Sequence, residues 1–133
     1  MKKVLVGAAF LFATFSQAIT PTLSKQRVVF RTDFGDLVFV LYPTVAPQTV
    51  EQFLKLVRLG IYDSTHFYRA HPGFVLQVSD ANGREWPMTP QQKQAIRKIP
   101  AEFSSLSHQY GALTMAHYDG QPDSGEVSFS IML

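Results

Sequence analysis

Apolar and polar positions along the chain repeat with two different periods, and these periods predict strands and a helix. Residues 28–32 and 37–41 are rich in β-branched and aromatic side chains and flank a turn-forming run that contains Gly35. This order predicts a β-hairpin. Shorter extended runs follow at residues 61–62, 67–69, 74–78, 113–116 and 127–132. Short strands separated by turn residues indicate a mainly β fold, either a barrel or a sandwich.

One segment has helical spacing instead. Its apolar residues recur every three or four positions between Pro47, which suits a first helical turn, and Gly60, which suits a C-terminal cap. We therefore expect an amphipathic helix over residues 47–59 that packs on the sheet. Residues 89–99 are polar and lie among three prolines, so we expect a loop there.

The N-terminus differs in composition from the rest of the chain. Met1-Lys2-Lys3 is basic, residues 4–15 are apolar, and Ser16-Gln17-Ala18 has small residues at its two ends. This order is typical of a secretory signal peptide over residues 1–18, followed by one domain over residues 19–133. The apolar run is shorter than the roughly 20 residues that a membrane-spanning helix needs. An uncleaved membrane anchor is the alternative.

Net charge and cysteine content limit which binding partners and which cellular compartment we expect. Of the 12 Lys and Arg residues, Lys2 and Lys3 belong to the predicted signal, so the mature chain balances ten against its 10 Asp and Glu. Without a basic run, nucleic acid is not an expected partner. The chain has no Cys, which excludes disulfides and suits an oxidising compartment. We expect a periplasmic or secreted protein, with the bacterial periplasm the simplest location, and no membrane span once the signal is removed.

No cofactor or metal site is expected. His66, His71, His108 and His117 are not paired on a predicted helix, and no Asp or Glu stands at the offsets of a zinc or calcium motif. Ordinary polar surface or a hydrogen-bonded His explains these residues better. The serines lack the strand-turn-helix elbow that activates a nucleophile.

The run FYRAHPGFVLQ at residues 67–77 carries the candidate chemistry, because it places an Arg and a Gln among apolar residues. A buried, unpaired guanidinium is costly, so Arg69 must find a partner, reach solvent or face a ligand. The run resembles the FHRVIPGFMVQ signature of the cyclophilins, which are peptidyl-prolyl cis-trans isomerases. Residues 36–43, 46–53 and 102–116 resemble further family segments in the same order, and the resemblance runs from about Val28 to Ile131.

The resemblance implies a fold and a site. The fold would be a closed antiparallel β-barrel with a capping helix, acting as a monomer on proline-containing segments of unfolded or exported proteins. Arg69 would stabilise the twisted amide, Phe74 would form the floor of the proline pocket, and Gln77 would hold the substrate backbone. Further substrate contacts would come from Tyr68, Val75, Met115, Ala116, His117, Ser128 and Ser130.

Each of the three main residues also has an ordinary interpretation. Arg69 could be a surface or ion-paired side chain on an edge strand, and Phe74 could belong to the core. Gln77 lies three residues beyond Phe74, which places the two on opposite faces of a regular strand. A shared pocket therefore requires a twist or a bend that the sequence does not specify.

The resemblance weakens near the C-terminus. The family pattern places a second substrate-binding Gln where this chain has Ser128, and an aromatic pocket wall where it has Ser130. The chain also stops at Leu133 inside a predicted strand, so we expect the strands that complete the barrel to be missing. These departures favour two alternatives to an isomerase: a proline-peptide binding or chaperone-like module with little activity, or an inactive truncated product.

Overall fold

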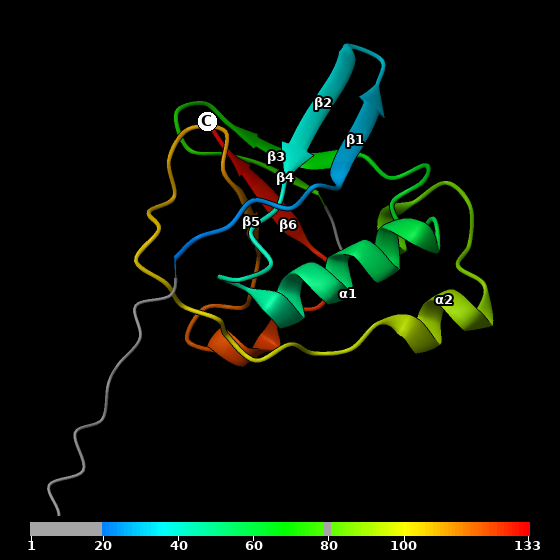
Figure 1. Ribbon diagram of the computed structural model, residues 1–133. Coiled ribbons are helices and arrows are strands. Elements are labelled where there is room, and N and C mark those ends of the chain that lie inside the picture. Colours follow the sequence, from blue (N-terminus) through cyan, green and yellow to red (C-terminus); the bar gives the residue numbers. More distant parts are fainter. Residues whose placement is uncertain (1–19, 79–80) are drawn as a thin grey trace, which may run out of the picture.

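The computed structural model describes residues 20–78 and 81–133 (Figure 1). The predicted signal peptide over residues 1–18 lies outside the described residues. The elements in chain order are β1 (Arg27–Thr32), β2 (Gly35–Val40), α1 (Pro47–Arg58), β3 (Phe67–His71), β4 (Val75–Val78), α2 (Pro90–Ala95), β5 (Leu113–Met115) and β6 (Phe129–Met132). Two short 3-10 turns lie at Ala81–Gly83 and Pro122–Ser124. No helix within residues 20–78 and 81–133 is long and apolar enough to cross a membrane.

The strands form two antiparallel sheets. One sheet is the predicted hairpin β1–β2, which stands out from the body of the molecule in Figure 1. The other has the strand order β3-β4-β6-β5, so the C-terminal strand lies in its interior. Within the described part of the chain, no ladder joins the two sheets, and closure of a barrel stays a prediction.

Helix α1 lies close to its predicted bounds. Pro47 occupies its first turn, and its C-terminus has the hydrogen bonds of a Schellman motif, from Gly60 N–H to Val57 O and from Ile61 N–H to Leu56 O. Gly60 has φ +65°, which a residue without a Cβ adopts most easily. The prediction that residues 61–62 are extended was wrong, because Ile61 belongs to this helix end and packs in the core beside Leu56.

Aromatic rings connect the two sheets and α1. The Phe129 ring of β6 lies 5.1 Å from that of Phe30 in β1, 5.6 Å from that of Phe53 in α1 and 5.2 Å from that of Tyr62, measured between centroids. The Tyr62 hydroxyl donates to the Val127 carbonyl over 2.9 Å. Burial raises the pKa of Tyr62, so the hydroxyl keeps its proton and remains a donor. This cluster forms the main core.

The prediction of a loop over residues 89–99 was wrong in part, because residues 90–95 form α2. Pro90 occupies the first turn, where its missing N–H does no harm. Thr89 and Gln92 form a reciprocal capping box: the Gln92 N–H donates to the Thr89 hydroxyl, and the Thr89 N–H donates to the Gln92 amide oxygen. Gln52 fixes the end of α2 on α1 by donating to the Ala95 carbonyl over 2.7 Å.

Candidate functional site

The β3–β4 hairpin brings the three main candidate residues together. Arg69 of β3 and Gln77 of β4 are directly opposed in the ladder, so their side chains share one face. A register shift between Phe67 and Arg69 sets this pairing. Phe74 lies in the turn before β4 begins, next to Gly73, which has φ +70°.

The side chain of Arg69 contacts both of the other residues. Its Nη1 donates to the Gln77 Oε1 over 3.3 Å, and its Cζ lies 5.4 Å from the centroid of the Phe74 ring. Strand alternation does not separate Phe74 from Gln77, because Phe74 lies outside the strand. The three side chains therefore form one constellation, in which Phe74 is 47% exposed and available to a ligand.

Strand β6 extends this face across the sheet. Ser130 is directly opposite Gln77 of β4 on one side and Thr114 of β5 on the other. Opposed residues of antiparallel strands point the same way, so Arg69, Gln77, Ser130 and Thr114 form one row. Sequence reasoning missed Thr114, although it alternates with the apolar Leu113 and Met115 and so should lie on the other face.

Ser128 lies beside this row, just before β6. Its hydroxyl donates to the Val78 carbonyl over 2.6 Å and accepts a hydrogen bond from the Gln77 Nε2 over 3.4 Å. Ser130, which the resemblance predicts to replace an aromatic pocket wall, is 8% exposed. Ser128 is half-buried and Ser130 is buried, whereas Arg69 and Phe74 are exposed.

The other candidate residues lie around this centre with different degrees of access. Tyr68 is exposed at the register shift in β3, whereas Val75 is buried and only 4% exposed. Met115 ends β5, and the Ala116 N–H donates to the Ser128 carbonyl over 2.9 Å. His117 is exposed, with its Nδ1 2.9 Å from the Tyr118 carbonyl oxygen. The roles assigned to all of these residues stay predictions.

The family assignment comes from comparison with known proteins. A family model described as "Cyclophilin type peptidyl-prolyl cis-trans isomerase/CLD" matches residues 27–133, which is most of the chain. The chain belongs to the cyclophilin family.

Individual relatives agree with this assignment. A peptidyl-prolyl cis-trans isomerase of Arabidopsis thaliana is 47% identical over 99% of this cyclophilin and 60% of its own length. The crystal structure of a Cryptosporidium parvum cyclophilin in the presence of the dipeptide Ala-Pro has a TM-score of 0.67 at 28% identity, covering 80% of this chain and 67% of the other. A Hirschia baltica cyclophilin with a TM-score of 0.64 is 23% identical, covers 80% and 56%, and is similar in fold.

These likenesses establish a mainly β cyclophilin fold with a capping helix. The chain spans about 60% of the length of the Arabidopsis relative. The bacterial exported subtype stays a prediction.

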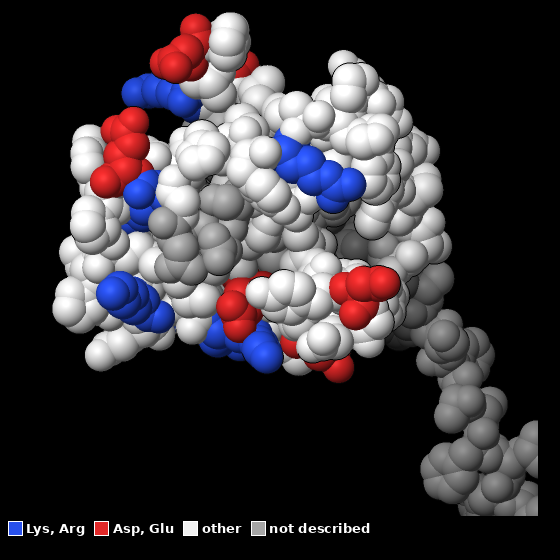
Figure 2. All heavy atoms as spheres, turned by 180° about the vertical axis from the view of Figure 1, so that it is seen from behind, with Lys and Arg blue, Asp and Glu red and all other residues white. Residues whose placement is uncertain are grey.

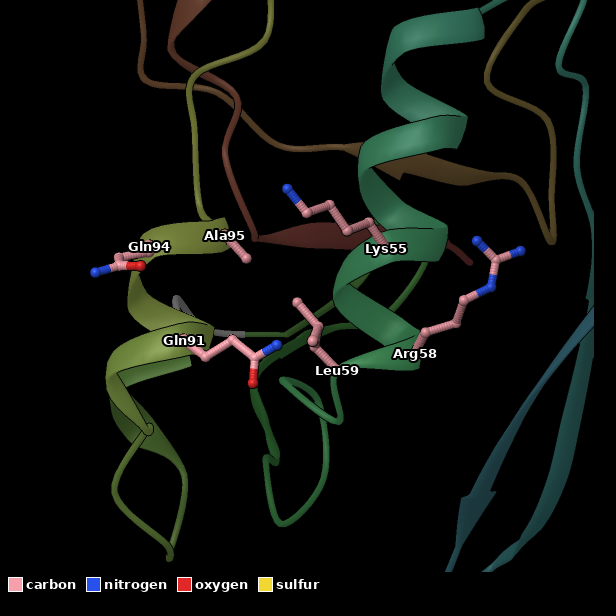
Figure 3. A pocket seen from close by; sticks show the side chains of 6 residues that line it. All are labelled: Lys55, Arg58, Leu59, Gln91, Gln94 and Ala95. Atoms are coloured by element: carbon pink, nitrogen blue, oxygen red, sulfur yellow. The ribbon is translucent and has the colours of Figure 1, made fainter.

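Two hollows in this cyclophilin lie away from Arg69. One is a groove beneath β1, lined by residues 28–32 and 62–67 together with Val57, Val78, Trp86 and Phe129. The other lies between α1 and α2, where Figure 3 shows Lys55, Arg58, Gln91 and Gln94 around the smaller apolar Leu59 and Ala95. Neither lining includes Arg69, Phe74 or Gln77, so these hollows are separate from the candidate site.

Charged side chains of the cyclophilin are scattered on the face shown in Figure 2, where uncharged surface and Asp or Glu residues lie between the Lys and Arg residues. A continuous basic surface of the kind that binds phosphates is not present on that face. Among the described residues, no group of three His, Asp or Glu side chains is arranged to hold a metal ion.

Proposed function

We propose that this cyclophilin is a peptidyl-prolyl cis-trans isomerase that acts, as a monomer and without a cofactor, on proline-containing segments of unfolded or exported proteins. The observation that carries the proposal is the contact of the Arg69 guanidinium with both Phe74 and Gln77. Family membership supports it, as do the name of the Arabidopsis relative and the Ala-Pro dipeptide used with the Cryptosporidium cyclophilin.

The reaction needs no bond cleavage. Rotation about an Xaa-Pro bond has a barrier of about 20 kcal/mol, because the amide loses its conjugation as it twists. In the twisted state the proline nitrogen regains a lone pair, which accepts a hydrogen bond. A guanidinium directed at that nitrogen binds the twisted state more strongly than either planar isomer and so lowers the barrier.

The three residues divide this work. Phe74 offers an exposed ring on which the proline ring can pack, while Arg69 donates to the amide nitrogen. Gln77 holds the guanidinium over the ring and presents an amide to the substrate backbone. A well-placed donor in a water-excluded site is worth roughly 3 to 4 kcal/mol, or about two to three decades in rate. Arg69 is exposed in the free protein, so the bound peptide must cover it, and orientation must supply the remainder.

The test is NMR exchange spectroscopy on an Ala-Pro peptide with catalytic amounts of the purified protein, after cooperative unfolding has shown that it is folded. We expect the cis/trans exchange rate to rise in proportion to protein concentration. A folded protein that leaves the exchange rate at its uncatalysed value would refute the proposal. Titration of the same peptide, followed by chemical shifts, measures binding separately from catalysis.

Ser128 and Ser130 favour a second candidate function, a proline-peptide binding or chaperone-like module with little activity. An aromatic wall contributes apolar contact area that the Ser130 side chain does not, which weakens the hold on the proline ring. In the experiment above, saturable binding without faster exchange would favour this module.

We also propose that the protein acts after export, in the periplasm or outside the cell. The basic start, the short apolar run and the small residues at positions 16 and 18 support this. Expression in a bacterium, followed by mass spectrometry of the periplasmic fraction, should recover a chain that begins at Ile19. Recovery of only the intact chain from the membrane fraction would favour an uncleaved anchor.

A further inference from the structure

The hydroxyl of Ser128 is linked to Arg69 through the side chain of Gln77. Ser128 Oγ donates to the Val78 carbonyl over 2.6 Å, and Gln77 Nε2 donates to Ser128 Oγ over 3.4 Å. At the other end of the same amide, Gln77 Oε1 accepts from Arg69 Nη1 over 3.3 Å. Three side chains and one backbone carbonyl thus form a continuous chain of hydrogen bonds.

The hydrogen bonds of this series all run in one direction, because the group at each end can act only as a donor or only as an acceptor. A serine hydroxyl has a single proton, and here the Val78 carbonyl takes it. Toward Gln77 the hydroxyl can therefore only accept, which selects the NH₂ end of the amide. A guanidinium can only donate, so Arg69 selects the oxygen end. Both neighbours demand the same amide orientation.

We infer that Ser128 is a positioning residue, which fixes the orientation of the Gln77 amide and thereby holds the Arg69 guanidinium over Phe74. The inference rests on the proposed isomerase function and deepens it. It also revises the expectation that Ser128 is only a shortened substrate contact. Without the hydroxyl, the amide can turn its NH₂ group toward Arg69, where two donors meet and the hydrogen bond is lost.

The variant that tests this is Ser128→Ala, which removes the hydroxyl and changes the volume little. The variant should lose the hydrogen bond between Arg69 and Gln77, and one such bond makes a small net contribution. We therefore expect the maximal exchange rate to fall about three- to tenfold. Peptide affinity should change less than about twofold, because the Phe74 ring, on which the proline ring packs, is not altered. Ser128→Thr keeps the hydroxyl and should restore most of the rate. Ser105→Ala makes the same chemical change in an exposed segment and should leave the rate unchanged.

Side-chain NMR provides a readout that does not depend on catalysis or on a variant. In the unsubstituted protein, the Gln77 Nε2 protons should show nuclear Overhauser contacts to the Ser128 β-protons. In Ser128→Ala, the Gln77 amide and Arg69 Nε signals should both shift. An unchanged maximal rate, or Gln77 amide protons without contact to Ser128, would overturn the inference. An inactive wild-type protein would instead refute the proposed function, while the NMR contacts would still test the link.

Discussion

Arg69 shows how a residue of ordinary type obtains a specific position from its neighbours. The guanidinium has a ring beneath it and an amide oxygen beside it, and both come from the same hairpin. The contact with Gln77 follows directly from the ladder, in which the two residues are opposed. The contact with Phe74 depends on the turn, which places the ring before β4 begins.

Phe74→Ala tests the ring at the residue scale. The variant removes the apolar surface that would bind the proline ring, and we expect Ala-Pro peptide affinity to fall about 5- to 30-fold, equivalent to about 1 to 2 kcal/mol of lost burial. NMR titration measures the affinity. Phe34→Ala, at the fully exposed tip of the β1–β2 hairpin, is the matched control. Equal affinities in the two variants would contradict the assignment of Phe74.

The sequence predicts which residues form the candidate site but not how they are arranged in space. The motif resemblance named Arg69, Phe74 and Gln77, but strand alternation alone separated Phe74 from Gln77. That separation assumed a strand running through position 74, whereas the strand begins at Val75. Ser128 also accepts a hydrogen bond from Gln77, which lies 51 residues earlier in the sequence. A local sequence pattern does not predict a contact over this separation.

At the scale of elements, the start of α1 is held by a distant carboxylate. Ala46, at the N-cap position, makes no side-chain cap, and Glu102 accepts from the backbone N–H groups of Gln48 and Thr49 over 3.0 and 2.8 Å. Desolvation raises the pKa of Glu102, but the hydrogen bonds from Gln48 and Thr49 together lower it by more. The pKa of Glu102 therefore lies below its usual value. The charged carboxylate thus replaces the missing cap.

Glu102→Gln should therefore destabilise the protein in a pH-dependent way. Because the folded-state pKa is lowered, the stabilisation is present above the unfolded-state pKa and is lost as pH falls through the folded-state value. We expect a loss of about 0.5 to 1 kcal/mol at pH 7, after allowance for solvent screening, that disappears in acid. Urea denaturation at several pH values measures this. Glu51→Gln, on an exposed position of α1, is the control, and an equal effect of both variants would contradict the capping role.

Helix α2 forms where we predicted a loop, although the sequence contains signals for a helix start. Prolines near residues 89–99 predict a loop when they are treated as helix breakers, but Pro90 stands at the first helical position, where proline is favoured. Thr89 and Gln92 have the spacing of a capping box, a pattern that predicts a helix start. The helix is short because the backbone turns extended at Ile96.

On the scale of the whole molecule, β6 links the core to the site. Phe129 lies in the aromatic cluster, whereas Ser130, its neighbour in the strand, lies on the same face of the sheet as Gln77 and Thr114. The core could be predicted in outline from apolar periodicity. The position of β6 between β4 and β5 could not, because the pairing of β6 with β4 joins segments more than 50 residues apart.

Phe129→Ala tests the central place of this ring. Removing a side chain that is 3% exposed and contacts three other aromatic rings should cost about 3 to 5 kcal/mol, a large part of the 5 to 15 kcal/mol typical of a domain. Equilibrium unfolding in urea should show a much lower midpoint than for the wild-type protein. Phe103→Ala, at an exposed position, is the control, and similar midpoints for both variants would contradict this account of the core.

The central claim is that Arg69 stabilises the twisted amide, and the exchange rate of an Ala-Pro peptide at saturation tests it most directly. We predict that Arg69→Ala lowers this rate by about 10²- to 10³-fold, while the variant unfolds cooperatively and binds the peptide with an affinity within a few-fold of wild type. A folded Arg69→Ala protein that accelerates exchange as well as wild type would contradict the account.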